Sequence, residues 1–354
     1  MAVDDDDVAR APLAAFLWAL VGLALSLAGP AAAATDPGWR AYQDRFITRE
    51  GRVVDTGNGN ISHTEGQGWG MLMAVYFDDP DRFDALYDWT REHLRRKVDG
   101  LYTWRFDPGA DPAAMDPNNA TDGDLLIAWA LELAGRHWER PRYRLDSERL
   151  RAAIRRHLII EYGGYQVLLP GRTGFQHDGY VNLNPSYYVM PALDCFARLD
   201  PGGPWRRLMY DGIRLIELAR KGGRKLPPDW VRLDQQGALS LAEQWPPRFG
   251  FEAVRVPLYF YWMGLGDVAF LDGVRRFWMR PRPPAWVDLE TGESADFPLS
   301  RGGLAVRALM LGNGDSIPLA PQPDDDYYSA SLLMLSRMAF HPAPLSSALE
   351  RKKL

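Results

Sequence analysis

Acidic side chains stand where a loop turns into a helix in segment 120–131, which reads ATDGDLLIAWAL. The helix is predicted by apolar residues spaced i, i+3, i+4 and i+7, namely Leu126, Trp129, Ala130 and Leu133. Asp122 falls in the first turn, where a carboxyl group can serve catalysis by moving a proton. The alternative is a helix cap, because Thr121 and Asp124 imitate a capping box and first-turn acids suit the helix dipole. This segment alone is typical of an active site or of a capped helix.

A second segment, 62–72, carries another acid at a predicted helix start and reads SHTEGQGWGML. Glu65 precedes an apolar stripe made of Trp69, Leu72, Met73 and Tyr76. A capping box between Ser62 and Glu65 is again the alternative. Three glycines follow the acid: Gly66, Gly68 and Gly70. Each costs a helix about 1 kcal/mol relative to Ala, so a plain cap does not explain them. We expect a ligand or another helix to approach closely here.

The N-terminus predicts export. Residues 12–30 are apolar and almost uncharged, and small residues at 31–34 precede Thr35, which is typical of a cleaved signal peptide over residues 1–34. The location would then be periplasmic or secreted, without membrane attachment after cleavage. Acids at 4–7 depart from the usual basic start, so an uncleaved membrane anchor is the alternative. Removing residues 1–34 changes the net charge from −5 to about −2, which favours neither nucleic acid nor anionic lipid as a partner.

Neither metal nor redox chemistry is indicated. The six histidines are scattered, and no H-E-x-x-H or Cys/His spacing occurs, so we predict no metal and no cofactor. His63 is expected to make structural or cleft hydrogen bonds. The lone Cys195 lies in an apolar run, is expected to be buried, and cannot form an internal disulfide.

Helical patterns recur along the chain, separated by loops rich in Gly, Pro and Asn, and only short pieces such as 165–169 are typical of strands. We predict an all-α fold, a toroid of helical hairpins, in which helix starts gather at one face and form a cleft. Residues 35–345 are expected to form a single domain, followed by a polar tail at 346–354. The predicted helices cover 39–47, 68–77, 81–94, 122–138, 147–162, 185–199, 205–220, 253–263, 268–277, 303–311 and 326–340.

Aromatic and amide side chains indicate a sugar ligand. Thirteen Trp and fifteen Tyr exceed what a core needs, and Trp104, Trp230 and Trp245 stand in polar, loop-like contexts. Such rings match the CH-rich face of a pyranose. Core packing is the expectation for Trp69, Trp129, Trp138 and Trp278. Loops containing Asn119 and Asn184 can bind sugar hydroxyls, or can simply form turns.

Together these segments resemble glycoside hydrolase family 8, and within it the periplasmic endoglucanases that accompany bacterial cellulose synthase. The resemblance runs from about residue 39 to 340 and is carried by segments 62–72, 120–138, 182–188 and 248–259. It implies an (α/α)6 barrel with an open groove that hydrolyses internal β-1,4 bonds of a glucan with inversion.

The resemblance also implies residue roles. Glu65 corresponds to the general acid, and Asp122 to the residue under the distorted sugar at the cleavage point. Tyr187 would help position the attacking water, and Arg255 would line the same site. Many relatives carry an Asp base in a Tyr-Asp-Ala-x-Arg context, where this chain reads FEAVR at 251–255. The base is therefore Glu252, or it lies elsewhere.

Inversion requires an acid and a separate base with roughly 6.5–9.5 Å between their carboxyl groups. Glu carries one more methylene than Asp, and a misplacement of about 1 Å can cost on the order of 10²-fold in rate, so slow turnover is expected. For Glu65 to act as the acid it must stay protonated near neutral pH, which requires desolvation or a nearby negative charge such as Asp122.

The sequence leaves other functions open. The same scaffold cleaves xylan or chitosan in some family members. A glucan-binding accessory protein of the cellulose-export apparatus, with little or no catalysis, is another reading, and a scaffold that binds only proteins is a third. The expected partners are a β-1,4-glucan and the cellulose synthase apparatus, and the expected state is a monomer.

Overall fold

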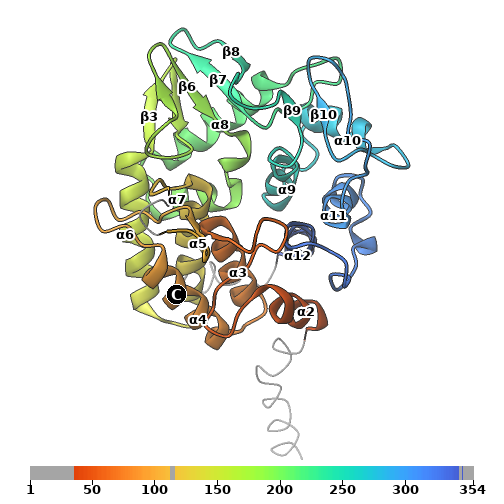
Figure 1. Cartoon of the computed structure of the whole chain (residues 1–354). Coiled ribbons are helices and arrows are strands. Elements are labelled where there is room, and N and C mark those ends of the chain that lie inside the picture. Colours follow the sequence, from red (N-terminus) through yellow and green to blue (C-terminus); the bar gives the residue numbers. More distant parts are fainter. Residues whose placement is uncertain (1–35, 112–115, 343–344, 346–354) are drawn as a thin grey trace, which may run out of the picture.

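The computed structural model describes residues 36–111, 116–342 and Leu345. Eleven α-helices dominate this described part (Figure 1). Their bounds are α2 (Pro37–Phe46), α3 (Thr64–Tyr76), α4 (Pro80–His93), α5 (Thr121–His137), α6 (Pro141–His157), α7 (Met190–Leu199), α8 (Trp205–Ala219), α9 (Arg255–Trp262), α10 (Asp272–Trp278), α11 (Arg301–Met310) and α12 (Tyr327–Phe340). Each predicted helix is present, with shifted ends. The largest shift is at α6, which begins six and ends five residues earlier than predicted, because residues Ile159–Tyr162 form a strand. α7 begins five residues later than predicted, because residues Pro185–Tyr187 form a separate 3-10 helix.

The inner helices close into a ring. α3 packs on α5, α5 on α7, α7 on α9, α9 on α12, and α12 returns to α3. The outer helices α4, α6 and α8 each pack on the inner helix that precedes them in the chain. One hydrophobic cluster takes residues from every helix between α2 and α12, and its largest fully buried side chains include Trp39, Trp69 and Trp278. The predicted toroid of helical hairpins is confirmed.

Glycines set the distance between α3 and α5. A Cβ atom on Gly68 would lie 2.5 Å from Leu126 Cβ, and one on Gly123 would lie 2.1 Å from Thr64 Oγ1. Gly66 faces α12, where a Cβ would lie 2.5 Å from the Tyr327 hydroxyl. The predicted close approach is therefore made by neighbouring helices, and it brings the starts of α3 and α5 side by side.

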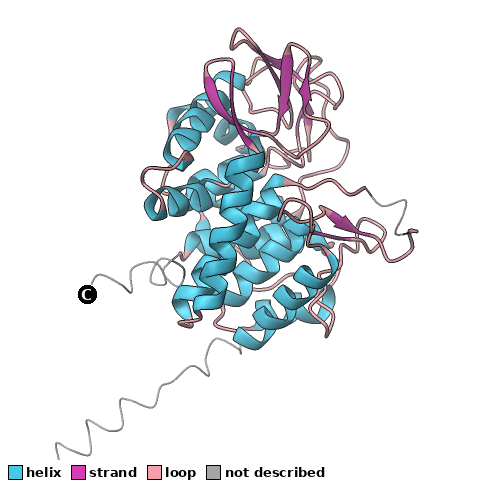
Figure 2. Ribbon diagram, turned by 90° about the vertical axis from the view of Figure 1, so that its left-hand side faces the viewer, coloured by secondary structure: helices cyan, strands magenta, loops and turns pink. Residues whose placement is uncertain are grey.

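Of the small antiparallel sheets, the sequence predicted only the strand at 165–169, which is confirmed as β4. The strands form three two-stranded sheets, β1–β2, β9–β10 and β3–β4, and a four-stranded sheet in the order β5-β6-β7-β8. Most of the strands gather at one end of the helical ring (Figure 2). With two to four residues each, they are too short to show a period-2 pattern. The bounds are β1 (Ser62–His63), β2 (Arg105–Phe106), β3 (Ile159–Tyr162), β4 (Tyr165–Leu168), β5 (Gln176–His177), β6 (Tyr180–Leu183), β7 (Val231–Asp234), β8 (Leu239–Leu241), β9 (Arg248–Phe249) and β10 (Val287–Asp288).

The predicted signal peptide at 1–34 and the polar tail at 346–354 lie outside the described residues. Among the helices that the structure describes, none combines the length and the apolar character needed to cross a membrane. Cys195 is buried and unpaired, as predicted.

Candidate active site

The two acidic helix starts are not capping boxes. In α3 the N-cap is His63, whose Nδ1 accepts from the Gly66 N–H at 3.1 Å, whereas Ser62 accepts from the Arg52 side chain. In α5 the N-cap is Ala120, which makes no side-chain cap. Thr121 donates to the Leu169 carbonyl at 2.6 Å instead of capping. The capping alternative is therefore wrong in both segments, because tertiary partners claim the side chains that it needs.

Asp122 is a buried carboxyl group without a compensating cation. Its side chain lies at the start of α5, the residue is 3% exposed, and Oδ1 accepts from the Gly123 N–H at 2.8 Å. Within the described part of the chain, no cationic side chain lies within ion-pair distance of it. Burial, together with the negative charge of Glu252, raises the pKa of Asp122 to about 8. A substantial fraction of Asp122 is therefore protonated at neutral pH.

Glu252 lies in the turn just before α9, with a third of its side chain exposed. Its Oε2 accepts from Asn184 Nδ2 at 3.1 Å and from Ser186 Oγ at 3.4 Å. Burial by the surrounding protein raises the pKa of Glu252, while the hydrogen bonds from Asn184 and Ser186 oppose that rise. The carboxylate thus has fixed partners on one oxygen and remains accessible from solution.

Arg255 joins the two carboxylates that the sequence singles out. Its guanidinium is 4% exposed and contacts Glu65 through Nη1 and Glu252 through Nη2. Nη2 also donates to Ser186 Oγ at 2.8 Å, and the group lies 6.0 Å from the centre of the Trp69 ring. The side chain of Glu65 is 15% exposed. Segments 190 residues apart in the sequence therefore meet on one rigid, planar cation.

Tyr187 stands beside the acidic cluster, in the 3-10 helix Pro185–Tyr187. Burial raises its pKa well above the ordinary value, and the negative charges of Asp122 and Glu252 raise it further. The phenol therefore stays neutral, so its O–H can donate a hydrogen bond throughout the physiological pH range.

An aromatic slab adjoins Tyr187. Trp230 and Trp245 stack with ring centres 4.1 Å apart and planes 7° apart, and Phe175 lies parallel to both. The Tyr187 ring is 6.0 Å from Trp230. All of these rings are partly exposed. Phe175 was missed from the sequence, because a single aromatic in a Gly- and Thr-containing loop gives no periodic signal.

Trp104 lies on the α3 side of the site. Its carbonyl accepts from the Thr64 N–H at 2.9 Å, and its indole N–H donates to Asp116 at 2.9 Å. The ring is partly exposed. It therefore stands next to the helix start that carries Glu65.

Asn119 and Asn184, both predicted to bind sugar hydroxyls, have side chains that point into the protein interior. Asn119 is 3% exposed, donates to Asp124 at 2.8 Å and accepts from the Arg172 N–H at 2.8 Å. Asn184 is fully buried, with its amide NH2 on Glu252 and its carbonyl accepting from Ser186. Both amides therefore orient carboxylates, because tertiary contacts turn them inward.

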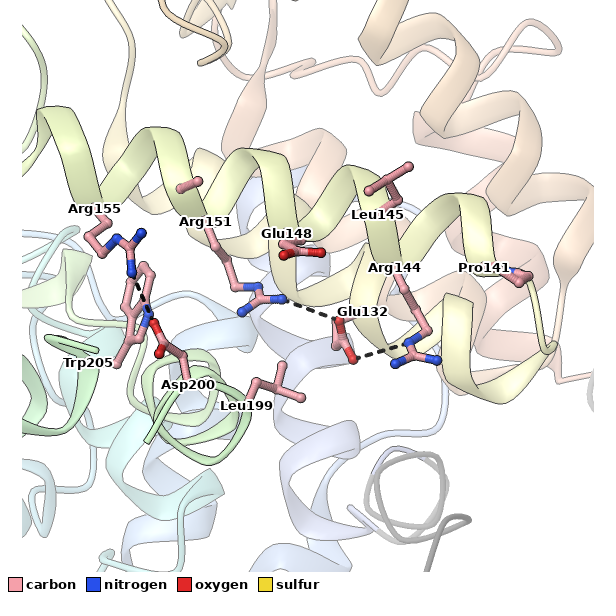
Figure 3. A pocket seen from close by; sticks show the side chains of 11 residues that line it. Glu132, Pro141, Arg144, Leu145, Glu148, Arg151, Arg155, Leu199, Asp200 and Trp205 are labelled. Atoms are coloured by element: carbon pink, nitrogen blue, oxygen red, sulfur yellow. Dashed lines mark hydrogen bonds and ion pairs between the residues drawn. The ribbon is translucent and has the colours of Figure 1, made fainter. Parts of the chain in front are cut away.

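A second charged cluster lies farther along α5. Glu132, 2% exposed, accepts from Arg136 Nε at 2.6 Å and lies 3.8 Å from Arg151 and 3.9 Å from Arg144. It lines a cavity of about 610 Å³ together with Asp200 and with residues of α6 and α7 (Figure 3).

Among the described residues, no group of three or more His, Cys, Asp or Glu side chains is placed to hold a metal ion.

Comparison with known proteins identifies the family. The model for glycosyl hydrolases family 8 matches residues 13–341. The chain is 41% identical to an endoglucanase of Cellulomonas uda, covering 85% of this chain and 84% of that protein. It is 42% identical to a probable endoglucanase of Novacetimonas hansenii, covering 89% and 93%. The crystal structure of a family 8 endoglucanase from Klebsiella pneumoniae superposes with a TM-score of 0.83 at 42% identity, covering 86% and 99%. The chain therefore belongs to family 8 of the glycosyl hydrolases.

Proposed function

We propose that this enzyme hydrolyses internal β-1,4 bonds of cellulose or a related β-glucan with inversion, using Glu65 as general acid and Glu252 as general base. Relatives at 41–42% identity are named endoglucanases, which supports a glucan over xylan or chitosan. The observation that carries the residue assignment is Arg255, which holds both carboxylates beside Asp122. A protein that only bound glucan would not require this arrangement.

In this mechanism Glu65 gives its proton to the glycosidic oxygen as the bond to the anomeric carbon breaks. Glu252 takes a proton from a water molecule that attacks the anomeric carbon from the opposite face. Tyr187, whose phenol stays neutral because its pKa is raised, would orient that water. Asp122 would lie under the reacting sugar, where its ionised form stabilises the positive charge that develops on the ring.

The ion pair between Arg255 and Glu65 is broken when Glu65 takes up the proton that it needs to act as the acid. Protonation of Glu65 removes the charge that Arg255 contacts on that side. Arg255 then keeps its contacts with Glu252 and Ser186. This leaves one protonated and one ionised carboxyl group, as an inverting pair requires.

The aromatic rings suit a chain of glucose units. Trp104 lies on the Glu65 side, and Trp245 belongs to the slab next to Tyr187. Each offers a partly exposed face for sugar stacking. We propose that they mark opposite arms of the groove that the family resemblance implies.

We further propose a role in bacterial cellulose biosynthesis, as a monomer in the periplasm after removal of residues 1–34. The support is the motif resemblance to endoglucanases that accompany cellulose synthase. Association with the synthase apparatus would follow from that location.

The test uses carboxymethylcellulose, with viscosity and new reducing ends followed together. Purified wild type is compared with Glu65→Gln, Glu252→Gln and the exposed control Glu290→Gln. We expect both site variants to lose about 10³-fold in kcat, within the range for removing a general acid or base, and the control to match wild type. If only Glu65→Gln fails, the base lies elsewhere. If wild type binds glucan without releasing ends, the chain is an accessory protein.

A further inference from the structure

Asp229 is a buried carboxyl group that the mechanism above does not use. It follows two prolines in the loop before β7, and the residue is 9% exposed. Its Oδ1 accepts from the Gly250 N–H at 3.0 Å and from the Ala253 N–H at 2.7 Å. Its own N–H donates to the Arg248 carbonyl at 2.6 Å. These contacts cross more than twenty residues of sequence and converge on one short turn.

That turn carries the proposed base. The two N–H groups bound by Asp229 belong to residues on either side of Glu252, so one carboxylate fixes the backbone before and after it. Gly250 permits this approach, because a Cβ there would lie 2.9 Å from Asp229 Oδ2 and 3.2 Å from Trp286 Cβ. A side chain at position 250 would push the turn away from Asp229.

The tip of the Glu252 side chain has separate supports. The side chains of Asn184, Ser186 and Arg255 contact its Oε2, whereas Asp229 binds backbone N–H groups of the turn. A Glu side chain has one more rotatable bond than Asp, so the carboxylate position depends on where the turn lies as well as on these contacts. Because both the backbone and the carboxylate of Glu252 are held, the longer side chain has little freedom.

We propose that Asp229 is the positioning residue of the general base: it holds the 250–253 turn so that Glu252 reaches the attacking water. The proposal rests on the assignment of Glu252 as base. Asp229 acts through the turn and does not itself touch the substrate.

The local charges provide a readout that a merely structural residue would not move. Burial and the charge of Glu252, opposed by the Ala253 N–H, raise the pKa of Asp229 to about 7. The charged groups around Glu252 are Arg255, which favours its ionised form, and Asp122 and Asp229, which oppose it when they are ionised. Because Asp229 carries little charge below about pH 7, the expected change comes from the turn: a turn that moves Glu252 away from Arg255 should make Glu252 ionise at higher pH.

The experiment compares kcat, KM and the pH–rate profile on a soluble glucan for wild type, Asp229→Ala, Asp229→Asn and Glu252→Gln. Asp234→Ala is the matched control, since Asp234 also accepts from two backbone N–H groups, in the turn between β7 and β8. Thermal unfolding and glucan binding are recorded for each variant to confirm that it is folded.

We expect Asp229→Ala to lose on the order of 10²-fold in kcat, as a displacement of about 1 Å would cause, with KM changed less than about threefold. Asp229→Ala should also move the acidic limb of the profile to higher pH. Asp229→Asn, which keeps the acceptor oxygen, should recover most of kcat and bring the limb back toward its wild-type position. Asp234→Ala should keep the wild-type kcat and limb.

Two results would overturn the proposal: wild-type kcat in Asp229→Ala, or an Asp229→Asn variant as inactive as Glu252→Gln, which would make Asp229 a catalytic group. If Asp229→Ala does not fold, Gly250→Ala takes its place, because the added Cβ pushes the turn away from Asp229, and wild-type kcat in that variant overturns the proposal. An active Glu252→Gln would instead refute the base assignment on which the proposal rests.

Discussion

Two buried carboxyl groups on helix α5 have opposite surroundings. Asp122 stands at the start of the helix, and Glu132 follows about 15 Å farther along the axis at 1.5 Å per residue. The two residues are 3% and 2% exposed. Glu132 is surrounded by Arg136, Arg144 and Arg151, whereas Asp122 has Glu252 as its charged neighbour.

The difference separates a carboxyl group that is paired for stability from one that we propose for catalysis. A buried charge costs several kcal/mol unless it is paired, and the arginines around Glu132 provide that pairing. The ion pairs around the cavity in Figure 3 satisfy one another, so this cluster joins α5 to α6. The unpaired Asp122 instead shifts its pKa, which is typical of groups selected for chemistry.

Asp122→Asn should produce the largest effect. It keeps the shape of the side chain but removes the carboxyl group that can ionise under the reacting sugar, so kcat should fall on the order of 10³-fold, as for other preorganised electrostatic groups. Stability at pH 7 should not decrease, because an unpaired buried carboxyl group is lost. Kinetics on carboxymethylcellulose and urea unfolding measure the two quantities. A wild-type kcat in Asp122→Asn would contradict the functional contrast drawn between Asp122 and Glu132.

Glu132→Gln should show the reverse pattern. Removing the carboxylate leaves Arg136, Arg144 and Arg151 without their shared partner, and we expect a loss of roughly 3 kcal/mol in the free energy of unfolding. The value of kcat at 25 °C should stay within about twofold of wild type. A variant that unfolds like wild type but turns over slowly would show that the two ends of α5 do not differ as described.

The pH dependence of stability should distinguish Asp122 from its neighbours. The folded chain keeps the Asp122 proton up to about pH 8, whereas the ordinary pKa of the free side chain is 3.8. Its contribution to stability is therefore complete below pH 3.8 and is lost as pH rises toward 8, at up to about 1.4 kcal/mol per pH unit. Buried Asp124 and Asp229 shift in the same direction, so the measurement is the difference between wild type and Asp122→Asn. A difference that does not change between pH 5 and 8 would refute the pKa shift.

Asn184→Ala should have the smallest effect. It removes one of the hydrogen bonds that oppose the raised pKa of Glu252, so that pKa should rise further. The acidic limb of the pH–rate profile should move to higher pH, with kcat at the optimum reduced several-fold. Asn119→Ala, which removes an amide from Asp124 instead, is the matched control and should leave the limb unchanged. An unchanged limb in Asn184→Ala would show that Asn184 does not act on Glu252.

Much of the scaffold could be predicted because its signals are local. Apolar residues at helical spacing located every helix of the described chain, and the glycines after Glu65 indicated a close helix contact. Of the strands, only β4 was located, at 165–169, since two to four residues carry too little periodicity to locate the others. The inward orientation of Asn119 and Asn184 was also out of reach, because a loop amide looks the same in sequence whether it faces solvent or a carboxylate.

The sequence by itself determined the family, the helices and the identity of the acids at the helix starts, because these depend on residues close together along the chain. Tertiary structure alone decided their chemistry. Arg255 meets Glu65 across 190 residues, and Asp229 meets the turn of Glu252 across more than twenty. Which carboxyl groups are paired, and which hold a proton at neutral pH, depends on charges and burial that only the folded chain brings together.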